Sequence, residues 1–234
     1  MKFWQNISWI EIDQMLEMAK FAEEVGFEGV MDGDHVFFPD PLTSPYPYTP
    51  DGIPPMTATD AYPDNFACAG AIAAVTTTLR YATQVFVLPP RNPLIVAKAA
   101  ATVALLGNHR FILGVGVGWM KEECEQAGVD FHTRGRRTDE MIEVMRKLWT
   151  GDAVEHHGEF FDFAPLRIPR RRGGSCRSTP AATARQRCGG RPGAARASSR
   201  PATSRTRSPA WSASSMRCGA KRVATTSRSR SSSH

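Results

Sequence analysis

Short apolar runs alternate with longer segments of helical periodicity through the first two-thirds of the chain. The apolar runs indicate strands over residues 2–7, 27–35, 80–88 and 110–117. Apolar residues that recur every three or four positions predict helices over residues 12–25, 64–75, 92–107 and from about 136 to 149. Because each strand is followed by a helix, we expect a parallel sheet with right-handed crossovers and helices outside it. The pattern therefore predicts the α/β class.

Two of the expected helices begin with capping signals. Asn92 followed by Pro93 is typical of a helix start, because Pro is tolerated at the first helical position. Ser8 and Glu11 have the spacing of a capping box, which predicts that the first helix begins directly after them.

Residues 36–63 interrupt the alternation of strands and helices. The segment is rich in Pro, Tyr, Asp and Thr and shows no periodicity. A loop of this length inside a compact domain is usually functional or disordered.

Three glycines at alternate positions follow the fourth predicted strand. Gly114, Gly116 and Gly118 do not form a dinucleotide fingerprint, which would follow the first strand and lead straight into a helix. Spaced by two in an extended segment, they project to one face and leave it bare for a flat group. This favours the rim of a closed eight-stranded barrel, where active sites lie, over an open doubly wound sheet. The alternative is that the glycines only relieve crowding between tilted strands.

The charge of the chain changes abruptly near residue 169. Residues 1–169 carry 13 Lys and Arg against all 23 acidic residues, whereas the remaining 65 residues carry 16 basic residues and no acidic one. No Leu, Ile, Phe or Tyr follows Ile168, so the segment 169–234 lacks the apolar surface that folding requires and is expected to be disordered. We therefore divide the chain into a folded part, 1–168, and a basic tail, 169–234.

Two interpretations of this tail stay open. An Arg- and Ser-rich tail could bind nucleic acid or another polyanion through its guanidinium groups. A shift of the coding frame near codon 169 would equally replace large aliphatic residues by Arg, Ser, Ala, Pro and Gly. We favour the frameshift, and then expect no partner among nucleic acids and a chain that has lost activity.

Several classes of protein are not indicated. The five cysteines are odd in number and contain no C-x-x-C pair, which argues against a disulfide framework or a zinc site. Glu155, His156 and His157 are adjacent, and neighbours on a strand face opposite ways, so we expect no metal site. No apolar stretch is long enough for a membrane span and no secretory signal opens the chain, so a cytoplasmic location is expected.

The chain resembles the luciferase-like monooxygenase superfamily from Met1 to about Arg167. The resemblance is carried by the segments "DGDHVFF", "VLPPRNPLIVAKAAATVALL", "RFILGVGVGWMKEE" and "VDFHTRGRRTDEMIEVMRKLWTG". Within the superfamily it is similar to the oxidoreductases that use the deazaflavin coenzyme F420. The resemblance implies a TIM-like (β/α)8 barrel, of which this chain carries the N-terminal half with about four βα units. It also implies a flavin or deazaflavin across the carboxyl ends of the strands.

The resemblance also suggests site residues. His35 is expected to be the catalytic acid or base, and Asp34 to orient its imidazole or the cofactor ring. Gln84 and Val85 stand where relatives have a non-proline cis peptide that bulges against the ring. The remaining expected cofactor contacts are Gly114, Gly116, Gly118 and Trp119, with Glu122 as a further cofactor or substrate contact.

Weaker expectations concern neighbouring side chains. Trp4, Trp9 and Phe37 could wall the cleft or simply belong to the core. The basic side chains of residues 132–137 could meet an anionic cofactor tail, or pair with nearby acidic groups and cap a helix.

The implied activity is hydride transfer between the C5 position of F420 and a small organic substrate. The alternative within the fold is a monooxygenase that uses FMN and a separate flavin reductase. A third hypothesis is the polyanion-binding protein led by the tail. The resemblance also implies a homodimer like those of the family.

Overall fold

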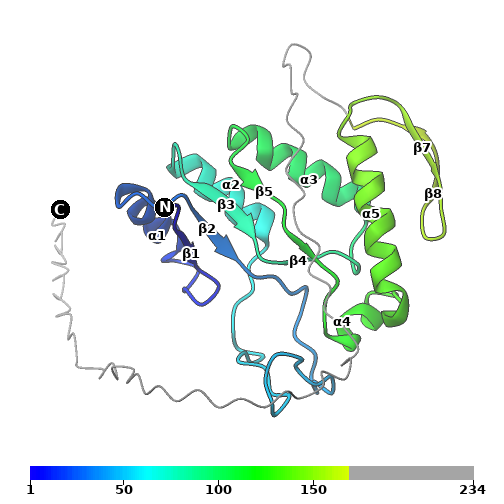
Figure 1. The fold of residues 1–234 in the computed structure, drawn as a ribbon, viewed down its shortest axis with the longest axis horizontal. Helices are drawn as coiled ribbons and strands as arrows, with labels where there is room; N and C mark the ends of the chain where they lie inside the picture. Colours follow the sequence, from blue (N-terminus) through cyan, green and yellow to red (C-terminus); the bar gives the residue numbers. More distant parts are fainter. Residues whose placement is uncertain (169–234) are drawn as a thin grey trace, which may run out of the picture. The chain divides into compact units, whose positions relative to one another are not determined.

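The computed structural model describes residues 1–168 of the chain. Its main sheet is parallel and contains four strands in the order of the sequence (Figure 1). These strands are β1 (Trp4–Asn6), β2 (Gly29–Asp32), β3 (Arg80–Thr83) and β5 (Phe111–Ile112). The predicted α/β class is confirmed, and the expectations for residues 169–234 lie outside the described residues.

Two of the strands continue beyond an interruption. β4 (Phe86–Val87) follows β3, and β6 (Val115–Gly116) follows β5, and the two continuations pair in parallel with each other. Ala82 pairs with Ile112 and Phe86 with Val115, so four steps along one strand oppose three along its partner. The extra residue makes a bulge between Ala82 and Phe86, which redirects the end of this strand.

Four long helices pack in chain order along the sheet. They are α1 (Met15–Glu24), α2 (Asn65–Val75), α3 (Pro93–Leu106) and α5 (Arg134–Leu148). Shorter elements complete the described part of the chain: α4 (Lys121–Gln126), the 3₁₀ turn η1 (Phe131–Thr133) and the antiparallel hairpin of β7 (Val154–His157) and β8 (Asp162–Leu166). None of the helices within residues 1–168 combines the length and the apolar character needed to cross a membrane.

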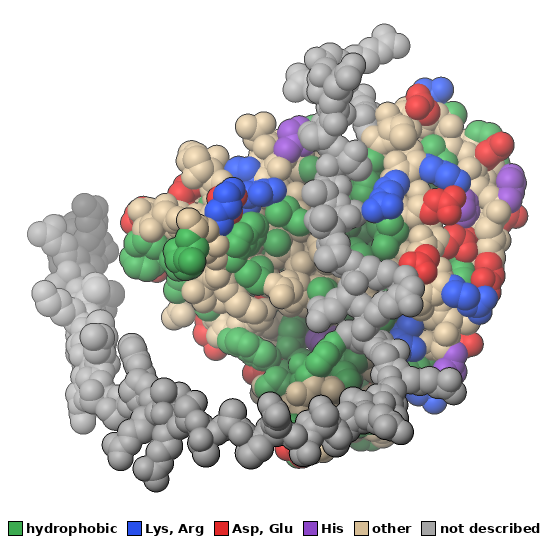
Figure 2. Space-filling view, in the orientation of Figure 1, with side chains coloured by type: hydrophobic (Ala, Val, Ile, Leu, Met, Phe, Trp, Pro, Cys, Tyr) green, Lys and Arg blue, Asp and Glu red, His purple; other side chains and the backbone are tan. Residues whose placement is uncertain are grey.

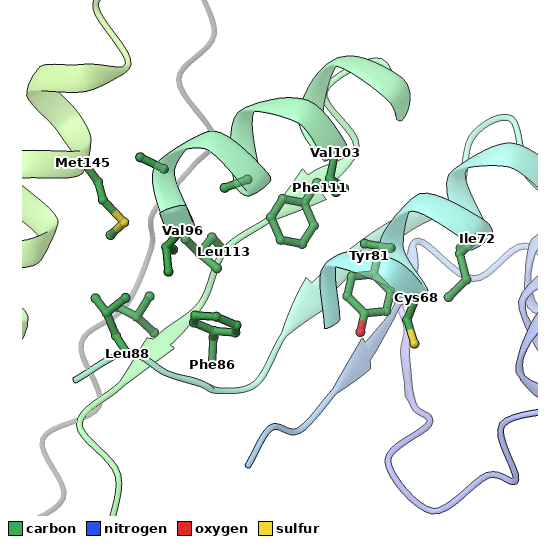
Figure 3. Packing of buried hydrophobic residues seen from close by; sticks show 14 of the residues in the cluster. Cys68, Ile72, Tyr81, Phe86, Leu88, Val96, Val103, Phe111, Leu113 and Met145 are labelled. Atoms are coloured by element: carbon green, nitrogen blue, oxygen red, sulfur yellow. The ribbon is translucent and has the colours of Figure 1, made fainter. Parts of the chain in front are cut away.

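The core lies between the sheet and the helices. Phe86 of β4 and Leu88 directly after it meet Leu113, Val96 of α3 and Met145 of α5 in one buried cluster (Figure 3). Burying a side chain of this size contributes about 1.5–3 kcal/mol. This cluster fixes the carboxyl ends of β4 and β6, where the candidate site is found.

One of the two predicted helix-capping signals is observed at the start of a helix, and the other is not. Asn92 caps α3, accepting a hydrogen bond from the Leu94 amide at 2.8 Å, with Pro93 at the first position as predicted. The predicted capping box of the first helix is wrong, because α1 begins only at Met15 and Gln14 makes no side-chain cap. Ser8 instead accepts a hydrogen bond from the Gly33 amide at 2.8 Å, which joins the ends of β1 and β2.

Candidate functional site

A cavity of about 370 Å³ lies at the carboxyl ends of the parallel strands. One part of its lining comes from residues at or just after strand ends: Asn6, Ser8, Trp9, Gly33, Asp34, His35, Gln84, Val85, Val87, Gly116, Val117, Gly118 and Trp119. The other part comes from the long loop between β2 and α2: Tyr46, Tyr48, Pro55, Met56 and Tyr62. A concave site that mixes apolar walls with a few polar groups is typical of small-molecule binding.

Most of the expected site residues meet in this cavity, but Gly114 does not. Its carbonyl oxygen accepts hydrogen bonds from the Phe86 amide at 2.8 Å and from the Thr83 hydroxyl at 2.7 Å. The residue therefore ties the bulged strand to its neighbour and is not part of the cavity lining. The expectation that Gly114 contacts the cofactor is not supported by its position.

Positions 116 and 118 require glycine for different physical reasons. A Cβ at Gly116 would overlap the side chain of Val85, so this bare face is covered by protein instead of being left open. Gly118 has a φ of +75°, which L side chains rarely adopt, and its Cβ would lie 2.9 Å from Cγ1 of Val87. Glycine at both positions lets the two strand ends approach each other at the cavity.

The peptide bond between Gln84 and Val85 is cis, as the resemblance led us to expect. Both residues line the cavity. The backbone amide of Gln84 donates a 2.6 Å hydrogen bond to the carbonyl oxygen of Asp32, which anchors the bulge to β2.

Asp34 is a buried structural clamp. Its carboxylate accepts hydrogen bonds from two guanidinium nitrogens of Arg91 at 2.7 and 2.9 Å and from the Val87 amide at 2.8 Å. Burial raises the pKa of Asp34 above its ordinary value, while Arg91 and the Val87 amide oppose that rise. The expectation that Asp34 orients the imidazole of His35 is wrong, since its oxygens are directed to Arg91 and Val87.

The carboxylate that holds His35 comes from Glu123 on α4. Oε2 of Glu123 lies 3.1 Å from Nδ1 of His35, and Oε1 accepts a 2.6 Å hydrogen bond from the Val36 amide. The Glu123 side chain is 0% exposed. With Nδ1 engaged, Nε2 is the nitrogen of His35 that remains for a ligand, and within residues 1–168 no hydrogen bond to it is formed.

Glu122 holds the long loop instead of lining the cavity. Its carboxylate accepts hydrogen bonds from the amides of Thr43 and Ser44, both at 2.8 Å, and from both hydroxyls. Burial alone would raise the pKa of Glu122, but the hydrogen bonds from Ser44 and Thr43 hold it at about 2. The expected direct contact of Glu122 with cofactor or substrate is replaced by this role in the loop.

The arginines of residues 132–137 are engaged with protein groups. Arg134 donates to the carbonyl oxygens of Gly118 and Phe131, and Arg137 donates to that of Pro89. Arg136 pairs with Glu159 at 2.6 Å. The sequence left open whether these side chains meet an anionic cofactor tail or pair with nearby groups. In the described structure the three arginines pair with nearby protein groups.

The remaining sequence candidates divide between cavity and framework. Trp9 lines the cavity, whereas Trp4 packs over Gly29 and Arg80, and Phe37 is absent from the lining. His156 and His157 bond to different acids, Glu140 at 3.2 Å and Asp162 at 2.6 Å. In the part of the chain that the structure describes, no three potential ligand side chains gather as metal ligands would.

The sequence model of one protein family matches residues 5–225, most of the chain, and its description is luciferase-like monooxygenase. The chain belongs to the luciferase-like monooxygenase family. The four strand–helix units and the site at their carboxyl ends are thus part of the TIM-like barrel of this family. The match continues to residue 225, past Arg167 where the resemblance was expected to end. The division at residues 168 and 169 stays a prediction.

Some of the relatives with named activities are F420-dependent enzymes. An uncharacterized protein of Mycobacterium tuberculosis is 40% identical over 153 residues, which are 65% of this chain and 53% of that protein. The F420-dependent glucose-6-phosphate dehydrogenase of Amycolatopsis mediterranei is 32% identical over 158 residues, 66% of this chain and 43% of that protein. A solved F420-dependent secondary alcohol dehydrogenase, in complex with an F420-acetone adduct, has a TM-score of 0.56 and 26% identity. That match covers 72% of this chain and 48% of the other. The chain spans about half the length of the curated relatives it matches.

Proposed function

We propose that this protein is an F420-dependent oxidoreductase that transfers a hydride between the deazaflavin and a small organic substrate. The observation that carries the proposal is the convergence of three features on one cavity: the Gln84–Val85 bulge, the glycine-lined end of β6 and the pair of His35 and Glu123. The named F420-dependent relatives support the same cofactor.

The residues of the cavity fit a flat ring with polar edges. Gly116 and Gly118 let the strand ends approach each other at the floor of the site, and Asn6, Ser8 and Gln84 place polar groups at the strand ends. A bound deazaflavin supplies hydride chemistry at its C5 position. No Lys or Arg of residues 1–168 lines the cavity, so the described residues would hold the ring and leave the anionic tail of the cofactor to other groups.

His35 has the position of a proton-transfer group in this proposal. In this proposal Nδ1 of His35 donates to Oε2 of Glu123, 3.1 Å away, and Nε2 is the nitrogen that accepts or returns the substrate proton. Oxidation of an alcohol needs a base for its hydroxyl proton, and reduction of a carbonyl needs the corresponding acid. Tyr62 and Trp119 make T-shaped contacts with the ring of His35, with centroids 5.2 and 6.0 Å away, and the His35 side chain is only 8% exposed.

The test is a fluorescence titration of the full chain with oxidised F420 and, separately, with FMN. The described residues form one part of the site, so we expect saturable binding of F420 weaker than low micromolar and about tenfold tighter than binding of FMN. Tighter binding of FMN would favour an FMN-dependent monooxygenase, which would draw reduced flavin from a separate reductase. Saturable binding of neither cofactor would overturn the proposal.

The other hypotheses remain predictions. Binding of a polyanion depends on residues 169–234, which lie outside the described part of the chain, and retention on DNA that disappears when these residues are removed would support it. Association into a homodimer is open to measurement by sedimentation.

A further inference from the structure

A carboxyl group is buried in the core directly beside the cavity. Asp32, the last residue of β2, is 2% exposed, and it does not belong to the cavity lining. Many other charged side chains of the described residues gather at the surface, over α5 and the hairpin of β7 and β8 (Figure 2). An ionised carboxylate loses its hydration in the core, so a buried Asp depends on partners inside the protein.

The polar and titratable groups around Asp32 come from every element packed against it: Ser8 after β1, Asp34 after β2, Tyr62 before α2, Asn65 and Cys68 on α2, and Tyr81 on β3. Burial raises the pKa of Cys68 to about 11 and that of Tyr81 well above its ordinary value, and the charge of Asp32 adds to both rises. These two groups are therefore neutral at physiological pH. An ionised Asp32 would find hydrogen bonds in this cluster but no opposite charge.

Two buried acceptor oxygens of the cluster lack a donor. Within residues 1–168, Oδ2 of Asp32 and Oδ1 of Asn65 form no hydrogen bond. Nδ2 of Asn65 donates to the carbonyl oxygen of Gly33 at 3.0 Å and to the hydroxyl of Tyr81 at 3.2 Å, which fixes the orientation of the amide. The same hydroxyl of Tyr81 also hydrogen-bonds to Asp32. Because the two side chains share this partner, one proton on Oδ2 of Asp32 would satisfy both oxygens, and leaving them unsatisfied is costly.

The surroundings of Asp32 support both of its charge states. Burial raises the pKa of Asp32, whereas hydrogen bonds from Ser8, the Gly33 amide and Tyr81 lower it. Burial and the acceptor oxygen of Asn65 favour the neutral acid, and the three donors favour the carboxylate. Oγ of Ser8 accepts from the Gly33 amide at 2.8 Å, and Ser8 also lines the cavity. One hydroxyl group therefore stands between Asp32 and the cavity.

We propose that Asp32 is a neutral carboxylic acid that donates a hydrogen bond to Oδ1 of Asn65 and releases its proton to the cavity through Ser8. In the release step the carboxyl group turns about its Cβ–Cγ bond and its proton passes to Oγ of Ser8. The hydroxyl proton of Ser8 passes to the group in the cavity that takes it up. Asp32 is left as a carboxylate, which the three donors stabilise. The cavity then has a proton source besides His35, whichever cofactor it binds, and in this the inference goes beyond the proposed function.

The first measurement is the infrared spectrum of the full chain without added cofactor. At neutral pH we expect the C=O stretch of an un-ionised carboxylic acid, which Asp32→Asn should remove and Asp34→Asn should keep, since Asp34 is paired with Arg91. A spectrum without this band, or a band that Asp32→Asn leaves unchanged, would overturn the proposal.

Urea denaturation of Asp32→Asn tests the same charge state through stability. Near pH about 4, the ordinary pKa of Asp, the variant should match the native chain, because its carboxamide donates to Asn65 as the neutral acid does. A carboxyl group whose folded pKa is raised loses stabilisation as pH rises from its unfolded pKa toward the folded value. Asp32→Asn should therefore become the more stable chain as pH rises. A variant that is less stable than the native chain at neutral pH would contradict a neutral Asp32.

The third measurement follows exchange of the same proton in heavy water, where the band shifts. Ser8→Ala should keep the band but slow its shift about tenfold, because the hydroxyl that leads to the cavity is gone. Ser8→Thr, which keeps a hydroxyl, should exchange like the native chain. Exchange in Ser8→Ala that is as fast as in the native chain, or slow exchange in Ser8→Thr as well, would overturn the connection through Ser8. Because F420 is absent from all three measurements, their failure leaves the proposed function standing, and failure of cofactor binding leaves this inference standing.

Discussion

Oε2 of Glu123 lies 3.1 Å from Nδ1 of His35, although the two residues are 88 positions apart in the chain. The other oxygen of the same carboxylate binds the amide of Val36, so one buried group fixes both the ring and the backbone beside it. A carboxylate that accepts the Nδ1 proton of a histidine sets its tautomer and its orientation. The direction in which His35 presents Nε2 to the cavity is therefore set from α4.

The first prediction concerns this pair. In an intact form of the enzyme, in which the barrel is complete, Glu123→Gln should lower turnover about 10- to 100-fold, because the carboxylate no longer orients the imidazole, and should leave affinity for F420 nearly unchanged. His35→Ala should likewise depress turnover more than affinity. Glu125→Gln is the matched control on the same helix, since Glu125 is exposed and pairs only with Lys121 in the described structure.

A readout that does not depend on turnover is ¹⁵N NMR of the His35 ring. The native chain should show the tautomer with the proton on Nδ1, and Glu123→Gln should mix or reverse it. A native spectrum with the proton on Nε2 would contradict the assignment of Glu123. Equal turnover in Glu123→Gln and in Glu125→Gln would exclude a positioning role.

The sequence alone predicts the strand–helix order because each element depends on local periodicity. It also places seven of the eight expected site residues at the cavity, through the rule that active sites lie at carboxyl strand ends and through the family resemblance. The expected cofactor contact of Gly114 is not supported, because the alternate spacing of the glycines does not indicate where a strand is interrupted. The cis bond at Gln84 was expected from the resemblance only, since nothing in the local pattern indicates it.

Local sequence patterns do not identify the residue that binds His35. Asp34 is its neighbour in the chain, but successive side chains of an extended segment point to opposite sides, so Asp34 reaches Arg91 instead. Glu123 is distant in sequence, and a glutamate in an acidic stretch ordinarily indicates a solvated position. Its signal was the pair of adjacent glutamates directly after the glycine-rich strand end, of which one had to face inward once α4 packed on the barrel rim.

The second prediction tests the close approach of the two strand ends. Gly116→Ala should destabilise the chain by about 1–3 kcal/mol, because the new Cβ would overlap the Val85 side chain. Val85→Ala in the same chain should recover much of that loss, since it removes the overlapping methyl groups. Urea denaturation of the two single variants and the double variant measures their coupling.

Gly70→Ala is the matched control for the double-mutant cycle of Gly116 and Val85. Gly70 lies within α2, and a Cβ there would meet nothing within 4 Å, so the substitution should stabilise by about 0.5–1 kcal/mol through helix propensity. Additive effects of Gly116→Ala and Val85→Ala would show that the two side chains do not compete for the same space.

The third prediction concerns acid stability. The carboxylate of Glu23 accepts hydrogen bonds from the successive amides of Thr77, Thr78 and Leu79, which join α1 to the turn before β3. Burial acts to raise the pKa of Glu23, but these hydrogen bonds lower it from 4.5 to about 2. A carboxyl group with a lowered folded pKa stabilises the native state above its unfolded pKa, and this stabilisation is lost as pH falls toward the folded value.

The stability lost in Glu23→Gln should therefore depend on pH. At pH 7 the variant should be less stable than the native chain by about 1 kcal/mol, a value kept modest because solvent screens a partly exposed group. The difference should shrink as pH falls from about 4.5 toward 2, where the native carboxylate becomes protonated as well. Glu24→Gln, at the exposed neighbouring position, should show no such trend in parallel urea titrations. A difference that stays constant across this pH range would mean that the backbone amides of the turn bind the uncharged carboxamide of the variant as well as they bind the carboxylate, and that Glu23 acts through shape alone.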